Sequence, residues 1–354
     1  TITRATRKEF PDGIPAFGAD ALRFTFASLA THGRDIKFDL NRCEGYKNFC
    51  NKLWNAARFV LGTLPETGSL ARPENWPVLP FERALLARFD ALVTQVDQQF
   101  AGYRFDLVAH ALYEFVWDEF CDWSIEFAKP WIQTDAAGNV GASVRYTLLA
   151  VLEATLRLAH PLIPFVSEEI WQHIAPRLGI ADGLLMHQPW PQAFARPRQT
   201  SDLDDIDWLK SAILKLRSVR STLGISPSRT LPLLIDGGDA SDAARLERFA
   251  ESLKALARIE SLATLTGPAP ASASAVLGEL RLLIPLEGLI DLDAERERLA
   301  KEISRVTAEK EKSTAKLARF TDRVPATVVE QERQRLATWS SQLQALLEQQ
   351  ARLG

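Results

Sequence analysis

The sequence predicts a mainly α-helical protein built in three successive parts: a helical bundle, a small α+β module and an antiparallel coiled-coil hairpin. Apolar side chains recur every three or four residues from residue 20 to about residue 177, as on the buried face of a helix. Shorter apolar runs bounded by turn residues follow, as in strands. From Leu292 onward, two long segments carry apolar residues in steps of three and four, the heptad pattern of a coiled coil.

The helical bundle is expected to occupy residues 20–200. A connector precedes it at residues 1–19, which are basic at first and then rich in Pro and Gly. A proline-rich linker at residues 186–200 is expected to end the bundle. Its helices are expected at residues 20–31, 43–63, 81–100, 104–128, 143–159 and 165–175.

The α+β module is expected at residues 201–288, where helical periodicity alternates with short apolar runs. Its helices are expected at residues 206–222 and 241–257. The strand candidates are "TLPLLID" (230–236), "IESLATL" (259–265) and "LRLLIPL" (280–286). The run "GPAPASAS" (267–274) is expected to form a flexible loop between strands.

The coiled-coil hairpin is expected at residues 289–354, with "TDRVP" (321–325) as the turn between two antiparallel helices. At about 1.5 Å per residue, each helix would be roughly 40 Å long. Polar residues enter the seam toward the tip, which predicts weaker packing there. The first seam is Leu299, Ile303, Val306, Lys310, Ser313 and Leu317, and the second is Val329, Glu332, Leu336, Trp339, Leu343, Leu346, Gln350 and Leu353.

Composition points to an ordinary globular protein, with 46% hydrophobic and 25% charged residues. The 42 basic and 45 acidic residues nearly balance, which argues against indiscriminate coating of nucleic acid but allows local basic patches. No apolar run approaches the ~18–20 residues of a membrane span, and no secretory signal is present. We expect a monomeric cytoplasmic protein without a membrane partner, and a piece of a longer chain because the sequence lacks an initiator Met.

Catalytic and metal-binding motifs are missing from the sequence. It contains no phosphate-binding loop, dinucleotide fingerprint, nucleophile elbow or HExxH zinc motif. Cys43, Cys50 and Cys121 have neither CxxC nor Cys/His ligand spacing, so buried thiols are the expected interpretation. We therefore predict no catalytic residue and no metal site.

One helix carries an unusual polar side. At about 100° per residue, Asn48, Lys52, Asn55 and Phe59 fall on one line, opposite the apolar face of helix 43–63. Amides pair with base edges, a lysine reaches phosphate or a base carbonyl, and an exposed ring stacks on an unpaired base. The alternative is that a second helix covers this side and the phenylalanine belongs to the core. Spacing alone favours that alternative.

A basic stripe on the hairpin is the second candidate for nucleic-acid binding. By default such a stripe is a solvated face with ion pairs between successive turns. Base exceeds acid toward the tip, where an anionic partner would gain most. The stripe comprises Arg298, Arg305, Lys312, Lys316, Arg319 and Arg323, and Arg333 and Arg335 extend it on the returning helix.

Several phrases resemble one family across essentially the whole chain. These are "GADALRFTFASLATHGRDIKFD", "GYKNFCNKLWNAARFV", "ALYEFVWDEFCDW", "HPLIPFVSEEIWQ" and "IPLEGLIDLDAERERLAKEI". Together they resemble the C-terminal part of bacterial valyl-tRNA synthetases, which are class I aminoacyl-tRNA synthetases. The first four occur in looser form in the isoleucine and leucine enzymes. The entry "LEGLIDLDAE" into a terminal hairpin is specific to the valine enzymes.

The resemblance implies a helical-bundle anticodon-binding domain and a coiled-coil arm that contacts the outer corner of a valine-specific tRNA. The complete enzyme uses ATP with Mg to attach valine. The HIGH and KMSKS motifs of that reaction have no match here, so this fragment alone is expected to be inactive and without a cofactor.

The resemblance also assigns roles to individual residues. Lys52 and Phe59 match the anticodon-reading helix, and Arg42 is included with them; Asn48 and Asn55 share the face by geometry alone. The arm residues expected at the tRNA elbow are Lys312, Lys316, Arg319, Arg323, Arg333 and Arg335. The basic N-terminal residues expected to approach the inner side of the tRNA are Arg4, Arg7 and Lys8.

Two alternatives stay open. The chain could be a protein-interaction module whose hairpin docks on another coiled coil through Lys310 in its seam. It could also be the equivalent region of an isoleucyl or leucyl synthetase, which would require a different C-terminal appendix.

Overall fold

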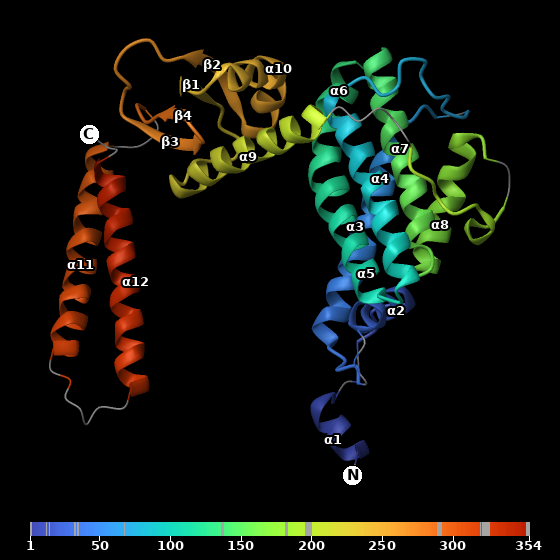
Figure 1. The fold of residues 1–354 in the computed structure, drawn as a ribbon, viewed down its shortest axis with the longest axis horizontal. Coiled ribbons are helices and arrows are strands. Elements are labelled where there is room, and N and C mark those ends of the chain that lie inside the picture. The colour runs from blue at the N-terminus through green and yellow to red at the C-terminus, as the bar shows by residue number, and fades with distance from the viewer. Residues whose placement is uncertain are drawn as a thin grey trace. The chain divides into compact units, whose positions relative to one another are not determined.

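The computed structural model describes most of the chain (Figure 1). It leaves out residues 1, 12, 14, 32, 34, 67, 136–137, 181–182, 195–199, 289–291, 319, 321–325 and 352–354. The described residues form two compact units, residues 1–207 and 208–354. The predicted fold class is confirmed: the protein is mainly helical, with one small mixed sheet and a C-terminal pair of helices. The finer domain boundaries proposed from the sequence remain predictions.

The first unit is a helical bundle. Its α-helices are α1 (Ile2–Glu9), α2 (Ala19–Leu29), α3 (Leu40–Thr63), α4 (Pro80–Ala101), α5 (Phe105–Glu114), α6 (Ile125–Thr134), α7 (Asn139–Ala159) and α8 (Pro164–Ile174). A π-helical segment, η1 (Phe115–Ser124), joins α5 to α6, and two short 3₁₀ turns, η2 (Ala175–Leu178) and η3 (Leu185–His187), follow α8. Helix α7 is buried along most of its length and forms the centre of the core.

A buried carboxylate organises one side of this core. Glu82 accepts hydrogen bonds from the hydroxyls of Ser143 and Thr147, both at 2.6 Å, and from the backbone amide of Leu79 at 2.7 Å. Burial raises the pKa of Glu82. Because its oxygen atoms are fully bonded inside the protein, we assign this carboxylate to the structure of the bundle and not to a binding site.

The second unit contains the sheet. Helix α9 (Thr200–Thr222) leads into it, and the remaining elements are β1 (Leu231–Gly237), α10 (Ala240–Ala257), β2 (Ile259–Thr264), β3 (Ser272–Leu277) and β4 (Leu280–Pro285). The strand order is β2-β1-β4-β3; β1 and β2 are parallel, and β4 runs antiparallel to both of its neighbours. Helix α10 makes the crossover that the parallel pair requires.

The hairpin closes the chain with α11 (Leu292–Ala318) and α12 (Ala326–Ala351), which run antiparallel (Figure 1). Its polar seam is bonded internally. Ser313 and Glu332 are buried, and Lys316 Nζ lies 2.7 Å from the Glu332 carboxylate on the other helix. At the base of the hairpin, Leu299 packs with Leu286 of the α+β module.

Three elements differ from the expectations. Helix α1 occupies the first part of the connector, for which no helix was expected. The predicted helix 104–128 continues to Thr134 through Pro130 and changes to π-helical geometry in its middle. The end of the "GPAPASAS" run joins β3, where pairing with β4 satisfies its backbone groups despite a composition poor in strand formers.

Helix α9 also begins earlier than expected, at Thr200. Arg83 of α4 holds its first turn through two hydrogen bonds to Asp202, at 2.7 and 3.0 Å. Acidic residues in the first turn suit the positive end of the helix dipole. Among the described residues, no helix is both long and apolar enough to cross a membrane.

Candidate nucleic-acid interface

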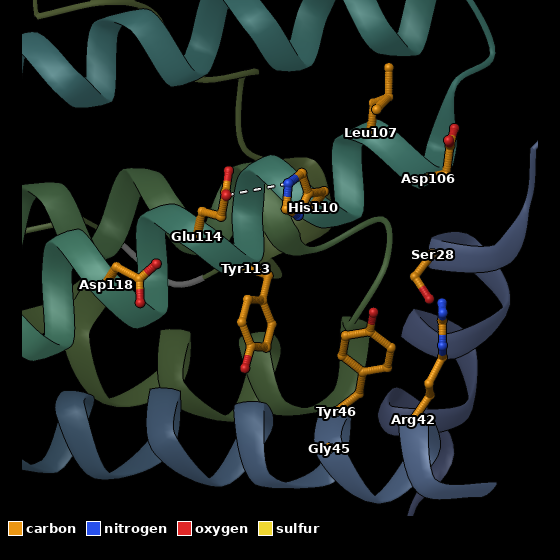
Figure 2. Close-up of a pocket in the computed structure, with 10 residues that line it drawn as sticks. All are labelled: Ser28, Arg42, Gly45, Tyr46, Asp106, Leu107, His110, Tyr113, Glu114 and Asp118. Atoms are coloured by element: carbon orange, nitrogen blue, oxygen red, sulfur yellow. Dashed lines mark ion pairs between the residues drawn. The ribbon is translucent and has the colours of Figure 1, made fainter. Parts of the chain in front are cut away.

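A cleft of about 620 Å³ opens between α2, α3 and α5 of the bundle (Figure 2). The side chains around it come from two stretches of sequence that lie some 60 residues apart, plus one residue of α2. Its lining residues are Ser28, Arg42, Gly45, Tyr46, Asp106, Leu107, His110, Tyr113, Glu114 and Asp118. We call it the α3–α5 cleft.

Aromatic packing fixes the two long walls of the cleft. Tyr46 and Phe49 of α3 pack on Phe24 of α2, with ring centroids 4.7 and 4.9 Å apart. In Figure 2, Tyr46 rises from α3 while Tyr113 descends from α5, and their rings meet edge to face at 6.1 Å. The cleft therefore has rigid aromatic surfaces, a form that suits a flat, partly apolar ligand.

Carboxylates outnumber basic groups in the cleft. Glu114 lies 3.3 Å from His110 Nε2, and Asp106 accepts two hydrogen bonds from Arg104 at 2.7 and 2.8 Å. Burial, reinforced by the charge of nearby Asp122, raises the pKa of Asp118. Because these oxygen atoms accept hydrogen bonds, the interior of the cleft fits a ligand that donates N–H groups better than it fits phosphate.

Arg42 stands at one end of this cleft. It is exposed and belongs to the first turn of α3, whose N-cap, Asp39, accepts a hydrogen bond from the Asn41 amide at 2.9 Å. The same carboxylate lies 3.9 Å from the Arg42 guanidinium, a loose pair of the kind that solvent screens strongly. Its cationic group thus remains accessible for an anionic partner.

Lys52, farther along α3, is held in place by the π-helical segment. Its ammonium lies 3.8 Å from the centroid of the Trp117 ring and 2.6 Å from Asp122 Oδ1. Trp117 in turn stacks on Tyr113 with ring centroids 5.3 Å apart. In a π-helix, hydrogen bonds run from residue i to i+5, so residues five apart lie on nearly the same side. This geometry directs both partners of Lys52 toward it.

The remaining predicted residues of α3 differ in exposure. Asn48 and Asn55 are exposed. Phe59 is half-buried, and the Lys129 ammonium lies 5.7 Å from its ring centroid. Arg42 and Phe59 are 17 positions apart, or about 26 Å along the helix. Asn48, Lys52, Asn55 and Phe59 thus form a line along α3, whereas Arg42 lies off that line and is the predicted residue that lines the α3–α5 cleft.

The predicted arm residues that the structure describes are exposed, but several have partners. Lys312 pairs with Glu309 at 2.6 Å, and Arg333 lies 3.9 Å from Glu330. Arg335 is exposed. Two predicted residues, Arg319 and Arg323, lie outside the described residues. In the N-terminal helix α1, the exposed basic side chains are Arg4, Arg7 and Lys8.

Sequence reasoning missed the wall of the cleft that α5 and the start of the π-helical segment form. Tyr113, Glu114 and Asp118 belong to the phrase "ALYEFVWDEFCDW", which was used only as a family resemblance. Its alternation of aromatic and acidic residues was an available signal. Within the described residues, no group of His, Cys, Asp and Glu is arranged to hold a metal ion.

Comparison with known proteins gives two family matches. Residues 82–235 match the anticodon-binding domain of tRNA ligases, a range that includes the α5 wall of the cleft but not α3. Residues 291–354 match the valyl tRNA synthetase tRNA binding arm. The hairpin therefore belongs to a family of tRNA-binding arms.

The curated relatives are valine–tRNA ligases. Those of Stenotrophomonas maltophilia (strain K279a), Xanthomonas campestris pv. campestris (strain B100) and Xylella fastidiosa (strain 9a5c) are 54%, 52% and 51% identical to this chain. Each alignment covers 99% of this chain, but only 37%, 38% and 37% of the respective relative. The chain thus spans little more than a third of their length.

Among solved structures, the ternary complex of Agrobacterium radiobacter K84 agnB2 LeuRS with tRNA and LeuAMS has a TM-score of 0.37 and 13% identity. It covers 72% of this chain and 27% of that chain, a similarity too low to inform the fold. The two family matches and the ligase relatives give the assignment. The chain belongs to the valyl-tRNA synthetases, of which it forms the anticodon-binding and tRNA-binding arm region.

Proposed function

We propose that this chain holds valine tRNA at its anticodon loop and its outer corner, so that the complete ligase can attach valine to the 3′ end. Its role is to position the RNA, and no described residue is assigned to the chemical step. Joining valine to tRNA requires ATP with Mg²⁺, which we assign to the complete ligase and not to these residues. We further propose that the protein works as a monomer in the cytoplasm.

The chemistry of the α3–α5 cleft is the observation that carries this proposal. Its tyrosine rings offer surfaces for an unpaired base, and Glu114 and Asp118 offer hydrogen-bond acceptors. Adenine and cytosine present exocyclic amines, which are donors, on their base edges. Valine codons begin with GU, so valine anticodons contain both of these bases. Arg42 at the end of the cleft is suited to an adjoining phosphate.

Lys52 and Phe59 extend this surface along α3. We propose that Phe59 stacks on a second unpaired base and that Lys52 exchanges Asp122 for an RNA oxygen on binding. The pair with Asp122 is partly solvated, the side chains being 23% and 51% exposed, so the exchange costs little. Asn48 and Asn55, exposed on the same helix, are proposed to border the loop.

The arm and the N-terminal helix are proposed to supply phosphate contacts. On the arm, these are Lys312, Lys316, Arg333 and Arg335, with Arg319 and Arg323 at the tip as sequence predictions. In α1, Arg4, Arg7 and Lys8 are proposed to approach the inner side of the tRNA. Contacts to phosphate fix orientation without reading sequence, and each releases counterions.

Fluorescence anisotropy with labelled tRNA tests the proposal. The chain should bind valine tRNA more tightly than a tRNA with a different anticodon, and both affinities should fall as salt rises. Binding that is absent, or equal for the two tRNAs, would contradict the anticodon role. Binding that does not respond to salt would contradict the phosphate contacts.

A further inference from the structure

A second cleft, of about 680 Å³, lies in the α+β module where helices α9 and α10 both end. Its lining includes three arginines, Arg217, Arg220 and Arg258, and two serines, Ser221 and Ser226. No acidic residue lines it in the part of the chain that the structure describes. We call it the arginine cleft. Neither the predicted site residues nor the proposed anticodon and arm contacts include it.

Arg220 lies inside this cleft and holds its walls together through hydrogen bonds. Its side chain is buried, and its guanidinium donates to the carbonyl oxygen atoms of Ser226 at 2.8 Å, Arg229 at 2.5 Å and Arg258 at 3.3 Å. These bonds fold the loop after α9 against the end of α10. Within the described residues, no carboxylate pairs with this guanidinium, so its charge is balanced only by carbonyl dipoles. Burial and the charge of Arg258 lower the pKa of Arg220.

Arg217 and Arg258 add two exposed cations. Arg217 donates to the Leu256 carbonyl from both Nε and Nη2, at 3.1 and 2.9 Å, which leaves the outer edge of its guanidinium toward solvent. Arg258 follows α10 with φ of 57°, in the left-handed region. Gly or Asn is the residue usually found there, because other side chains are disfavoured. The chain therefore places a long cation at a position where its backbone is strained.

Capping of helix ends explains only part of this arrangement. Arginines near helix C-termini satisfy free carbonyl groups, and that accounts for the bonds of Arg217 and Arg220. It does not account for Arg258, whose side chain makes no ion pair within the described residues. Three like charges around one cleft repel each other unless an anion enters. Guanidinium groups are the usual partners of phosphate, because their planar N–H donors match its oxygen atoms.

We propose that the arginine cleft binds a phosphodiester of the tRNA backbone, which gives the α+β module an RNA contact of its own. This inference rests on the proposed function, because it takes the ligand from the tRNA that the chain is proposed to hold. A phosphate contact reads no sequence, so the cleft contributes equally to every tRNA.

The test measures tRNA affinity of the full chain by anisotropy at several salt concentrations. The variants are Arg258→Asn, Arg217→Gln and their combination. Asn is well tolerated at positive φ, so Arg258→Asn removes the charge without a folding penalty. The matched control is Arg281→Gln, which removes an equal charge at the other end of strand β1, where Arg281 pairs with Asp236. A melting curve for each variant verifies folding.

The double variant should bind every tRNA about tenfold more weakly than the control, with its salt slope reduced by roughly one to two. Arg217→Lys, which keeps the charge, should restore part of the affinity. A double variant with the affinity and slope of the control would overturn this inference alone. Failure of the unaltered chain to bind tRNA would contradict the proposed function and this inference together.

Titration with inorganic phosphate separates the two sources of the anion. We expect phosphate to compete with tRNA only at high concentration. Tight phosphate binding that Arg258→Asn abolishes, with tRNA affinity unchanged, would identify a site for free phosphate and overturn the assignment to RNA.

Discussion

The α3–α5 cleft and the coiled-coil arm differ in how they carry charge. In the cleft, the half-buried rings of Tyr46 and Tyr113 lie beside the exposed carboxylates of Glu114 and Asp118, and acceptors outnumber cations. On the arm, Lys312, Arg333 and Arg335 are exposed. Hydrogen-bond acceptors beside aromatic rings discriminate between bases by the donors that the bases present, whereas exposed cations attract any phosphate and are screened by salt. The cleft is thus suited to distinguishing one tRNA from another, and the arm to binding every tRNA.

Neutralising the cleft should have the largest effect, and that effect should be on the discrimination between tRNAs. Glu114→Gln combined with Asp118→Asn removes the charged acceptors while keeping side-chain shape. The preference for valine tRNA over a tRNA lacking adenine and cytosine in its anticodon should shrink by about 1–3 kcal/mol per base contact. Anisotropy at fixed salt measures it. Glu119→Gln, in the same π-helical segment but paired with Arg88, is the control that should leave this preference unchanged.

Neutralising the arm should have the next largest effect, and on every tRNA alike. The triple variant Lys312→Gln, Arg333→Gln and Arg335→Gln should weaken binding on the order of tenfold and reduce the salt slope by about two to three. The opposite change, Glu309→Gln with Glu330→Gln, removes acids beside the same cations and should strengthen binding. Loss confined to valine tRNA would show that the arm reads identity after all.

The pair between Lys52 and Asp122 allows a smaller, two-sided test. Asp122→Asn frees Lys52 from its ion pair, so tRNA affinity should rise roughly two- to threefold, in keeping with the ~0.2–1 kcal/mol of a partly exposed pair. Lys52→Gln should lower affinity by a similar factor. If both substitutions weaken binding, the pair itself positions α3, and the proposed exchange is wrong.

The smallest effect concerns the stability of the arm and its dependence on pH. The Lys316 ammonium and the Ser313 hydroxyl hold the pKa of Glu332 below its usual value. A carboxyl group with a depressed folded pKa stabilises the protein above its unfolded pKa, and this gain disappears as pH falls through the folded pKa. Lys316→Met should therefore lower the melting temperature near pH 7, and the difference from the unaltered chain should vanish in acid. A difference that persists at low pH would contradict this account.

The helical framework was predictable because the buried face of a helix requires apolar residues at every third or fourth position. Helix α3 and the two arm helices follow apolar spacing closely, and their predicted bounds differ from the structure by a few residues. The π-helical segment was not predictable, since a change from i+4 to i+5 bonding barely disturbs that spacing. Strand β3 was hidden for a different reason: its first residues come from an Ala/Ser-rich run that only pairing with β4 orders.

The candidate site was predictable only on its α3 side. Spacing on one helix grouped Lys52 with Phe59 because both lie on the same line. It could not show that Trp117 and Asp122 hold Lys52, because those partners come from a helix about 70 residues away in sequence. The cleft itself forms where three helices pack together, and no local sequence pattern predicts that packing. Arg42 is the one predicted residue that lines it.

The central claim is that carboxylates of the α3–α5 cleft accept a hydrogen bond from a base amine. The test uses a tRNA in which the middle anticodon adenine is replaced by unsubstituted purine, the same ring system without the exocyclic amine. The substitution removes only the proposed hydrogen-bond donor. Anisotropy should give an affinity loss of about 1–3 kcal/mol for the unaltered chain and a smaller loss for the Glu114→Gln, Asp118→Asn variant, whose amide oxygen atoms are neutral and weaker acceptors. An equal loss in both proteins would contradict the claim, because the amine would then be recognised elsewhere.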